Sequence, residues 1–522
     1  MNPLVVATTM AKRGMLAPGP PQRTARQLLA LRRWGFGLAG ELRQAASRSP
    51  KAVAVIDEQR GAVTYAELLA RSERAATVLA DLGAAPGTRV GLLARNHVGA
   101  VEILFGASAI GVDLVLLNTG LSAEQLALVA AQQELVTLVH DDEFGPVVAA
   151  LPDALTRIDE TAFTTRLEAL PGPAPLSPPA RAGRTIILTS GTTGTPKGAA
   201  RKTPGGFGPL VTMIDRIPLR ARGRILISAP IFHTWGFAAL QLATALRAIV
   251  ILQRRFDPAQ VRATIGDERV DALFAVPVML QRMLELPDDG RSADRSRLRV
   301  VATSGSAYPS GFTTRFMDAY GEVLYNLYGS TEASWISIAT PAHLRRHADT
   351  AGTPPLGTIV RLVGEDGRDV PDGERGRIFC GNDLVFEGYT AGAANKEFLD
   401  GLVATGDIGH REGGLLFVDG RDDDMIISGG ENVFPSEVES ALIDHPAIRE
   451  VAVVGVPDAD FGQRLAAFVV LHEGHAVTAD EVREHVRSRR ARHVVPRDVV
   501  VLDELPRNAT GKVLYRELRE RA

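Results

Sequence analysis

Short apolar runs recur at regular intervals through the middle of the chain. Five of them, rich in Ile, Val and Leu, occupy residues 184–190, 224–230, 248–253, 271–276 and 298–305. Each is followed by polar, Gly-bearing or Pro-bearing residues, and often by a stretch with helical spacing. Such runs are typical of strands that are buried on both faces, as in parallel α/β sheets. Residues 50–165 alternate in the same way, so the pattern predicts an α/β fold.

The beginning of the chain has a different pattern. Residues 1–45 are expected to form a partly helical N-terminal extension, and residues 25–44 (ARQLLALRRWGFGLAGELRQ) form a basic amphipathic stretch. A helix packed on its own domain is the favoured interpretation of this stretch. The alternative is a contact with a membrane surface. A Pro- and Ala-rich segment, residues 171–183, reads as an irregular surface connection.

Towards the C-terminus the pattern changes twice. Residues 352–420 combine alternating apolar positions with frequent turn residues, which predicts a small antiparallel β module. Beyond Arg421 the order helix, strand, strand, helix, strand predicts a compact α+β domain, in which Thr478 and Glu481 form a capping box. The charged run DGRDDD, residues 419–424, is the expected boundary.

Composition narrows the class of protein. Lys and Arg number 58 against 61 Asp and Glu, a net charge of −3, so no overall charge favours a nucleic-acid partner. The single cysteine, Cys380, excludes an intramolecular disulfide bond. No apolar run reaches the roughly 20 residues of a spanning helix, so we expect no integral membrane segment. These features predict a cytoplasmic protein.

Polar motifs follow directly after several predicted strands. They are SGTTGTPKG at 190–198, FHTWGF at 232–237, SGSAYP at 304–309 and YGSTE at 328–332. Because ligands of open α/β sheets bind at the carboxyl ends of the strands, the four motifs are expected to converge on one crevice. The first motif offers Gly backbone N–H groups, hydroxyls and a lysine, which suits phosphate, although its spacing differs from that of a Walker loop.

Together the motifs resemble those of the adenylate-forming superfamily. The resemblance is carried by TSGTTGTPKG (189–198), YGSTE (328–332), TGD (405–407), GRDDDMIISGGENVFPSEVE (420–439) and RNATGK (507–512), and it covers roughly residues 45–522. It implies that a carboxylate attacks the α-phosphate of ATP, giving acyl-AMP and pyrophosphate. A thiol, usually that of coenzyme A, then takes the acyl group and releases AMP. The implied cofactors are ATP, Mg²⁺ and coenzyme A.

The resemblance also implies roles for individual residues around the nucleotide. Glu332 would hold Mg²⁺, and Thr331 would bind near the α-phosphate. The ATP phosphates would contact Thr189, Ser190, Gly191, Thr192, Thr193, Gly194 and Lys197. The adenine and ribose would contact Gly305, Ser306, Ala307, Asn326, Tyr328, Gly329, Asp407 and Arg421.

Further implied roles concern a moving C-terminal part. Lys512 would bridge the carboxylate and the α-phosphate, two anions that repel each other. The implied organisation is a large domain at 46–421, a hinge at 422–424 centred on Asp423, and a mobile C-terminal domain at 425–522. After adenylation this domain would rotate and bring Ser428, Gly429 and Gly430 to the coenzyme A side.

The acid substrate is expected to be a plain carboxylic acid. His233 matches a position that borders the acyl tunnel in this superfamily, and Trp235 and Phe237 are expected to help wall the acyl pocket. His233 could also transfer a proton, but packing or gating is favoured because the carboxylate is already ionised near pH 7. The stretch PIFHTWGF lacks the aspartate with which amino-acid activators pair the substrate ammonium.

The apolar loop-and-strand walls, with SGGENVFPSEVE, resemble those of synthetases for fatty, aryl or bulky alicyclic acids, and a fatty, alicyclic or other bulky aliphatic acid is favoured. Two other readings stay open, namely a ligase that loads a carrier-protein thiol and a non-catalytic relative that binds nucleotide or acyl ligand. The latter is disfavoured by the intact set Lys197, Glu332, Asp407, Arg421 and Lys512. A homodimer is possible.

Overall fold

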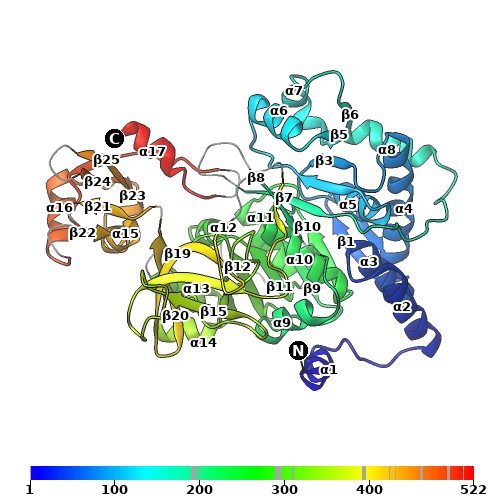
Figure 1. The fold of residues 1–522 in the computed structure, drawn as a ribbon, viewed down its shortest axis with the longest axis horizontal. Helices are drawn as coiled ribbons and strands as arrows, with labels where there is room; N and C mark the ends of the chain where they lie inside the picture. The colour runs from blue at the N-terminus through cyan, green and yellow to red at the C-terminus, as the bar shows by residue number, and fades with distance from the viewer. Residues whose placement is uncertain are drawn as a thin grey trace.

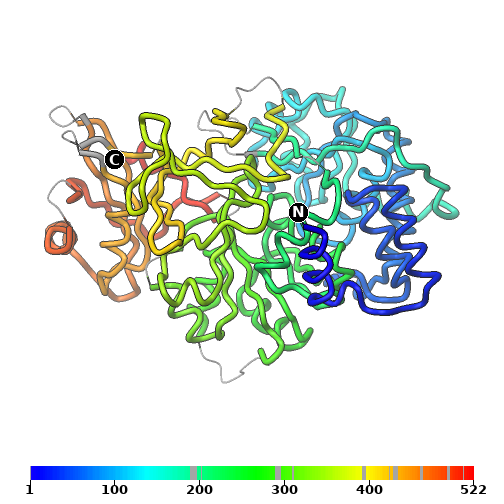
Figure 2. The backbone as a smooth tube through the Cα atoms, turned by 60° about the horizontal axis from the view of Figure 1, so that its bottom comes forward, coloured from blue at the N-terminus to red at the C-terminus, as the bar shows by residue number. Residues whose placement is uncertain are grey.

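The computed structural model describes residues 2–189, 197–201, 203–287, 295–308, 311–390, 396–422, 424–428, 431–458, 462–490, 494–508 and 511–522. Within these residues the chain forms four sheets. Figure 1 shows two large α/β layers in the middle and at one end of the long axis, and a small C-terminal α/β part at the other end. The tube in Figure 2 shows the same order along this axis.

One sheet, with strand order β17-β8-β7-β4-β3-β5-β6, contains a parallel core. Its parallel strands are β3 (Arg89–Leu93), β4 (Asp113–Leu116), β5 (Leu135–His140), β6 (Thr156–Asp159) and β7 (Thr185–Thr189). The antiparallel strands β8 (Lys197–Arg201) and β17 (Gly388–Tyr389) extend its edge. The helices of this region are α4 (Tyr65–Asp81), α5 (Val98–Ala109), α6 (Ala123–Gln132), α7 (Gly145–Val148) and α8 (Glu160–Ala169), with the 3₁₀ turn η1 (Asp142–Phe144).

The eight-stranded sheet has the order β14-β13-β12-β11-β9-β10-β1-β2. Its strands are β1 (Val53–Asp57), β2 (Gly61–Thr64), β9 (Arg224–Ile227), β10 (Ile249–Leu252), β11 (Ala272–Ala275), β12 (Val300–Ser304), β13 (Leu324–Tyr328) and β14 (Ser337–Ala339). All neighbours pair in parallel except β2 and β14 at the edges. The helices are α9 (Gly208–Arg216), α10 (Thr234–Ala245), α11 (Pro258–Asp267), α12 (Pro277–Leu284), α13 (Phe312–Tyr320) and α14 (Pro341–Arg346).

The predicted α/β fold is confirmed, and the five apolar runs divide between the two large sheets. Four of the five apolar runs are adjacent strands of the eight-stranded sheet, whereas the run at 184–190 supplies β7 of the other sheet. The chain turns back after β7 into the antiparallel strand β8 instead of entering a helix. Apolar content alone does not reveal which sheet a buried strand joins, because both sheets bury their strands equally.

The two C-terminal modules have the predicted character. Antiparallel strands β15 (Ile359–Val363), β16 (Gly376–Gly381), β18 (Phe398–Leu399), β19 (Leu402–Glu412) and β20 (Leu415–Arg421) form the β module. The last sheet contains β21 (Ile426–Ser428), β22 (Glu431–Val433), β23 (Ile448–Asp458), β24 (Gly462–Leu471) and β25 (Asp498–Val501), with α15 (Pro435–Ile443), α16 (Ala479–Arg487) and α17 (Tyr515–Arg521). The capping box of Thr478 and Glu481 is present at the start of α16.

The N-terminal stretch is not one amphipathic helix, which corrects the expectation for residues 25–44. After α1 (Pro3–Lys12), helix α2 (Pro21–Trp34) ends at Gly35, whose φ of +76° interrupts the helix, and α3 (Leu38–Arg48) begins anew. Helix α3 is buried against α4, α5 and α10, as the favoured interpretation requires. Helix α2 packs on α3 and leaves Leu28 and Leu29 exposed. No helix in the described part of the chain is both long and apolar enough to cross a membrane.

Candidate active site

The predicted convergence of motifs is present as one large cavity of about 1490 Å³. The chain that follows the carboxyl ends of β9, β11, β12 and β13 lines it, and these four strands are neighbours in the eight-stranded sheet. Lys197 of the other sheet and Lys512 of the C-terminal part line the same cavity. Segments far apart in sequence therefore meet because parallel strands present their carboxyl ends at one edge.

At one end of the cavity, the β module contributes a buried carboxylate. Asp407 on β19 and Arg421 on β20 are direct cross-strand partners, and Arg421 Nη1 lies 3.3 Å from Asp407 Oδ1. The Tyr328 hydroxyl donates to Asp407 Oδ2 at 2.5 Å. Burial raises the pKa of Asp407, while these two donors oppose the rise. Because a carboxylate has about four lone-pair positions, Asp407 can still accept hydrogen bonds from a ligand's hydroxyls.

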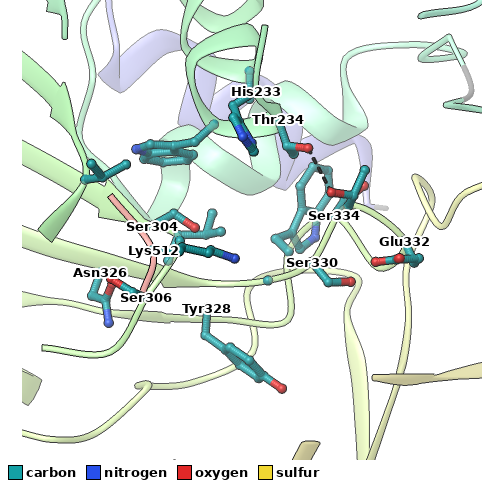
Figure 3. Close-up of a pocket in the computed structure, with 18 of the residues that line it drawn as sticks. His233, Thr234, Ser304, Ser306, Asn326, Tyr328, Ser330, Glu332, Ser334 and Lys512 are labelled. Atoms are coloured by element: carbon teal, nitrogen blue, oxygen red, sulfur yellow. Dashed lines mark hydrogen bonds between the residues drawn. The ribbon is translucent and has the colours of Figure 1, made fainter. Parts of the chain in front are cut away.

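A turn after β13 places Thr331 and Glu332 beside the start of α10. The hydroxyls of Thr331 and Thr234 lie 3.2 Å apart. Figure 3 labels Thr234 beside His233 and draws Glu332 on the neighbouring turn. The Tyr389 hydroxyl donates to Glu332 Oε1 at 2.5 Å, and Lys197 Nζ lies 5.5 Å from the centre of the Tyr389 ring. Tyr389 thereby connects the lysine of the phosphate motif with the acid of the YGSTE motif.

Two residues near Glu332 line the site but were not predicted from the sequence. Tyr389 is one of them, and it belongs to no recognisable motif. Arg201 is the other, and its guanidinium is hydrogen-bonded to the Ser334 hydroxyl. Burial lowers the pKa of Arg201 to about 10, and Glu332 opposes this. Arg201 had a detectable signal, because it lies four residues beyond Lys197 on β8 and alternate strand residues share a face.

Lys512 reaches the cavity from the C-terminal part (Figure 3). Its loop is closed by two hydrogen bonds with Asn508, from Lys512 N to Asn508 Oδ1 at 3.0 Å and from Asn508 N to Lys512 O at 2.9 Å. Burial lowers the pKa of Lys512, and the nearby carboxylates of Asp407 and Glu332 raise it. Both acids belong to the large part of the chain, and Arg421, which also acts on Lys512, lowers its pKa further.

Gly511 brings this loop into close contact with α12. Its φ is +79°, and a Cβ atom at this position would lie 2.3 Å from Val278 Cγ1. Only glycine combines this backbone conformation with so close an approach. The residue before Lys512 is therefore one point at which the C-terminal part docks closely on the wall of the cavity.

Five further predicted site residues line the cavity. They are Gly305, Ser306, Ala307, Asn326 and Gly329. Thr189 is the last residue of β7, and Ser428 pairs through its backbone with Gly462 in the C-terminal sheet. The remaining predicted residues, Ser190, Gly191, Thr192, Thr193, Gly194, Asp423, Gly429 and Gly430, lie outside the described residues.

The predicted acyl-pocket residues occupy the other end of the cavity, at the first turn of α10. His233 precedes the helix, and Trp235 and Phe237 lie within it. The Trp235 indole N–H lies 3.2 Å from the Ala275 carbonyl and 3.3 Å from that of Ala302, which ties α10 to the sheet. Burial, together with the charge of Lys512, lowers the pKa of His233 to about 4, so its ring is neutral near pH 7.

Comparison with known proteins adds independent information. Residues 42–390 match the family model of the AMP-binding enzyme, and residues 437–512 match the AMP-binding enzyme C-terminal domain. Feruloyl-CoA synthase of Amycolatopsis sp is 36% identical over 485 residues, which covers 91% of this chain and 97% of that protein. Indoleacetate–CoA ligase of Aromatoleum aromaticum is 36% identical over 476 residues, with coverage of 88% and 93%.

A solved structure has the same architecture. The o-succinylbenzoate CoA synthetase of Bacillus subtilis, in complex with its acyl-adenylate intermediate, superposes with a TM-score of 0.81 at 30% identity. The match covers 92% of this chain and 97% of that protein.

Proposed function

The chain belongs to the AMP-binding enzyme family and is an AMP-forming acyl-CoA ligase, and from this premise we propose that its substrate is a bulky, largely apolar carboxylic acid. A fatty, alicyclic or other bulky aliphatic acid is the class that we favour, and the apolar character of the cavity wall supports it. The wall beyond His233 is built mainly from apolar side chains, among them Trp235, Phe237, Leu210 and Leu242. No acidic residue stands in the stretch 230–237 to pair with a substrate ammonium.

The first half-reaction joins two anions, the carboxylate and the α-phosphate. The observation that carries the proposal is the burial of Lys512 in the same cavity as Thr331, Glu332 and Asp407. In this role the ammonium of Lys512 bridges the carboxylate and the α-phosphate and offsets their repulsion. Lys197 and Arg201 supply further positive charge beside Glu332.

Asp407 and Arg421 are proposed to bind the ribose, and Tyr328 to contact the adenine. The Tyr328 hydroxyl is used for Asp407, so its ring remains available for stacking. The phosphate residues 189–194 complete the site in this proposal. The backbone of 305–307 and Asn326 would contact the adenine edge.

Glu332 is the residue we assign to Mg²⁺. Its carboxylate is hydrogen-bonded through Oε1 to Tyr389, which orients it, and carboxylate oxygens are ligands that Mg²⁺ prefers. When bound, the ion would neutralise part of the phosphate charge. Tyr389 and Thr331 are then the groups of this chain that position the carboxylate and the phosphate beside it.

Coenzyme A is the proposed thiol acceptor, because the relatives named above are CoA synthases and CoA ligases. In the second half-reaction the C-terminal part would rotate about Asp423, withdraw Lys512 and bring residues 428–430 to the thiol. A carrier-protein thiol is the alternative acceptor. The cytoplasmic location and the homodimer stay predictions.

A screen for ATP–pyrophosphate exchange tests the proposal. The panel contains fatty, alicyclic and aryl acids, the last because one relative is named for ferulate. We expect exchange that depends on Mg²⁺ and on one class of acid. AMP release is then measured with coenzyme A and with a phosphopantetheinylated carrier protein. Exchange with none of the acids would overturn the proposed function, and AMP release with the carrier alone would replace the acceptor.

A further inference from the structure

The N-terminal segment forms one wall of the acyl end of the cavity. Phe36, in the connection between α2 and α3, packs edge-on against Phe207 with ring centres 4.9 Å apart. Leu38 and Glu41 of α3 line the cavity together with Ser108 of α5. This wall adds a carboxyl group to surroundings that are otherwise largely apolar.

Helix α10 gives the direction and length of the acyl end. Seven of its residues line the cavity and recur at helical intervals of three or four, so the cavity follows one face of the helix. They are Thr234, Trp235, Phe237, Ala238, Gln241, Leu242 and Ala245. The first of them, Thr234, is the one bonded to Thr331. From Thr234 to Ala245 there are eleven steps, and at 1.5 Å per residue the face is about 16 Å long.

Glu41 lies at the far end of this face. The Gln44 amide donates to Glu41 Oε2 at 3.1 Å and lies 3.5 and 3.3 Å from the carbonyls of Thr244 and Ala245, the last residues of α10. The acid is thus separated from the reacting centre by the length of the helix. It also precedes the segment matched by the family model, which begins at residue 42.

The carboxyl group of Glu41 is incompletely satisfied. Only 9% of the residue is exposed, and among the described residues Oε1 has no hydrogen-bond partner. The charged and titratable groups that act on it are Arg247 and Tyr65, and the Tyr65 hydroxyl is already donated to the Ala248 carbonyl. Burial raises the pKa of Glu41 to about 8, so it is mainly a neutral acid at pH 7, able to donate and to accept.

We propose that Glu41 determines specificity by hydrogen-bonding a hydroxyl group at the end of the acid farthest from its carboxylate. The inference rests on the proposed function of the cavity. A hydroxyl group matches a neutral carboxyl because each of them both donates and accepts. A methyl group would leave the buried carboxyl unpaired, and a second carboxylate would meet an acid with no cation bonded to it among the described residues. Ser108 and Gln241 line the same end and can share the contact.

The test compares pairs of acids that differ only in a distal hydroxyl group. Pyrophosphate exchange gives kcat/KM for each acid with the wild type, Glu41→Gln and Glu41→Leu, and with Leu242→Val of α10, which lines the same cavity, as the control. We expect the wild type to prefer the hydroxylated member at least tenfold, since a site built around a hydrogen bond rejects the analogue that lacks it. Glu41→Gln should keep part of the preference, Glu41→Leu should abolish or reverse it, and Leu242→Val should change both members equally.

The outcomes separate this inference from the proposed function. If acids are activated but the preference is absent, or is unchanged in Glu41→Leu, Glu41 is only a structural acid and the inference is overturned. If Glu41→Leu does not fold, Glu41→Gln decides: a preference for the hydroxylated acid equal to that of the wild type overturns the inference. If no acid supports exchange, both proposals fall together.

Discussion

Replacing Gly511 by alanine tests whether docking of the C-terminal part positions Lys512. The substitution has two separable costs. Alanine at a φ of +79° costs about 1–2 kcal/mol wherever the loop lies. In addition, its Cβ would lie 2.3 Å from Val278 Cγ1, whereas an ordinary contact begins near 3.4 Å. The loop must therefore retreat by about 1 Å, and a misplacement of this size costs on the order of 100-fold in rate.

The assay measures the two half-reactions separately. Pyrophosphate release should fall by about 100-fold, while transfer from preformed acyl-AMP to coenzyme A should stay near the wild-type rate. Gly474→Ala is the matched control, because its φ is +77° and nothing lies within 4 Å of the added Cβ. It carries the backbone cost without the collision, so both half-reactions should be nearly unchanged.

A second-site change gives the sharpest version of the test. The added Cβ would lie 3.5 Å from Val278 Cβ, an ordinary contact, so Val278→Ala removes the colliding atom. The double variant should recover most of the lost adenylation, and the coupling appears in a double-mutant cycle. Equal losses in both half-reactions, or no recovery in the double variant, would refute the reasoning.

Three further outcomes are expected. Lys512→Ala should nearly abolish pyrophosphate release and leave acyl-CoA formation from acyl-AMP largely intact; equal loss in both assays would contradict its bridging role. Because burial lowers the pKa of His233 to about 4, its charge is constant from about pH 5.5 to 7.5, and the adenylation profile of His233→Asn should run parallel to the wild type. A limb near pH 6.5 seen only in the wild type would contradict this. The folded-state pKa of Glu41, about 8, exceeds its ordinary 4.5, so the folded state binds the extra proton and stability falls as pH rises between these values. The Tm of Glu41→Gln should therefore gain on the wild type from pH 5 to pH 8, and a constant difference would contradict the shift.

The sequence was sufficient for the parts of the fold that follow from local pattern. Buried strands such as β9 and β12 are continuous apolar runs, and the motifs after them meet because parallel strands end at one edge. The C-terminal domain could also be predicted from local pattern, because α16 begins with a capping box and its apolar residues have regular helical spacing.

What the sequence did not reveal depends on long-range partners. Strand β7 has the same apolar composition as the strands of the other sheet. Nothing in the local sequence identifies β4 and β8 as the strands with which it pairs. Helix α2 ends before Gly35, whose positive φ interrupts the helix. The helical spacing of apolar residues continues across this position, so it does not reveal the break. Tyr389 and Glu41 carry no motif, and their relation to the cavity arises only from packing.

The order in which the wall of the acyl end is made has a consequence for synthesis of the chain. Gln44 on α3 bonds to carbonyls at the end of α10 that lie 200 and 201 residues further along. Helix α3 is buried along most of its length in the folded protein. During translation, the side of α3 that packs on α10 stays uncovered until α10 has emerged from the ribosome. Surfaces that are buried in the native state but stay exposed during synthesis are targets for aggregation and for chaperones. Slow codons or truncations between these two helices should therefore reduce the yield of soluble enzyme more than the same changes placed after α10.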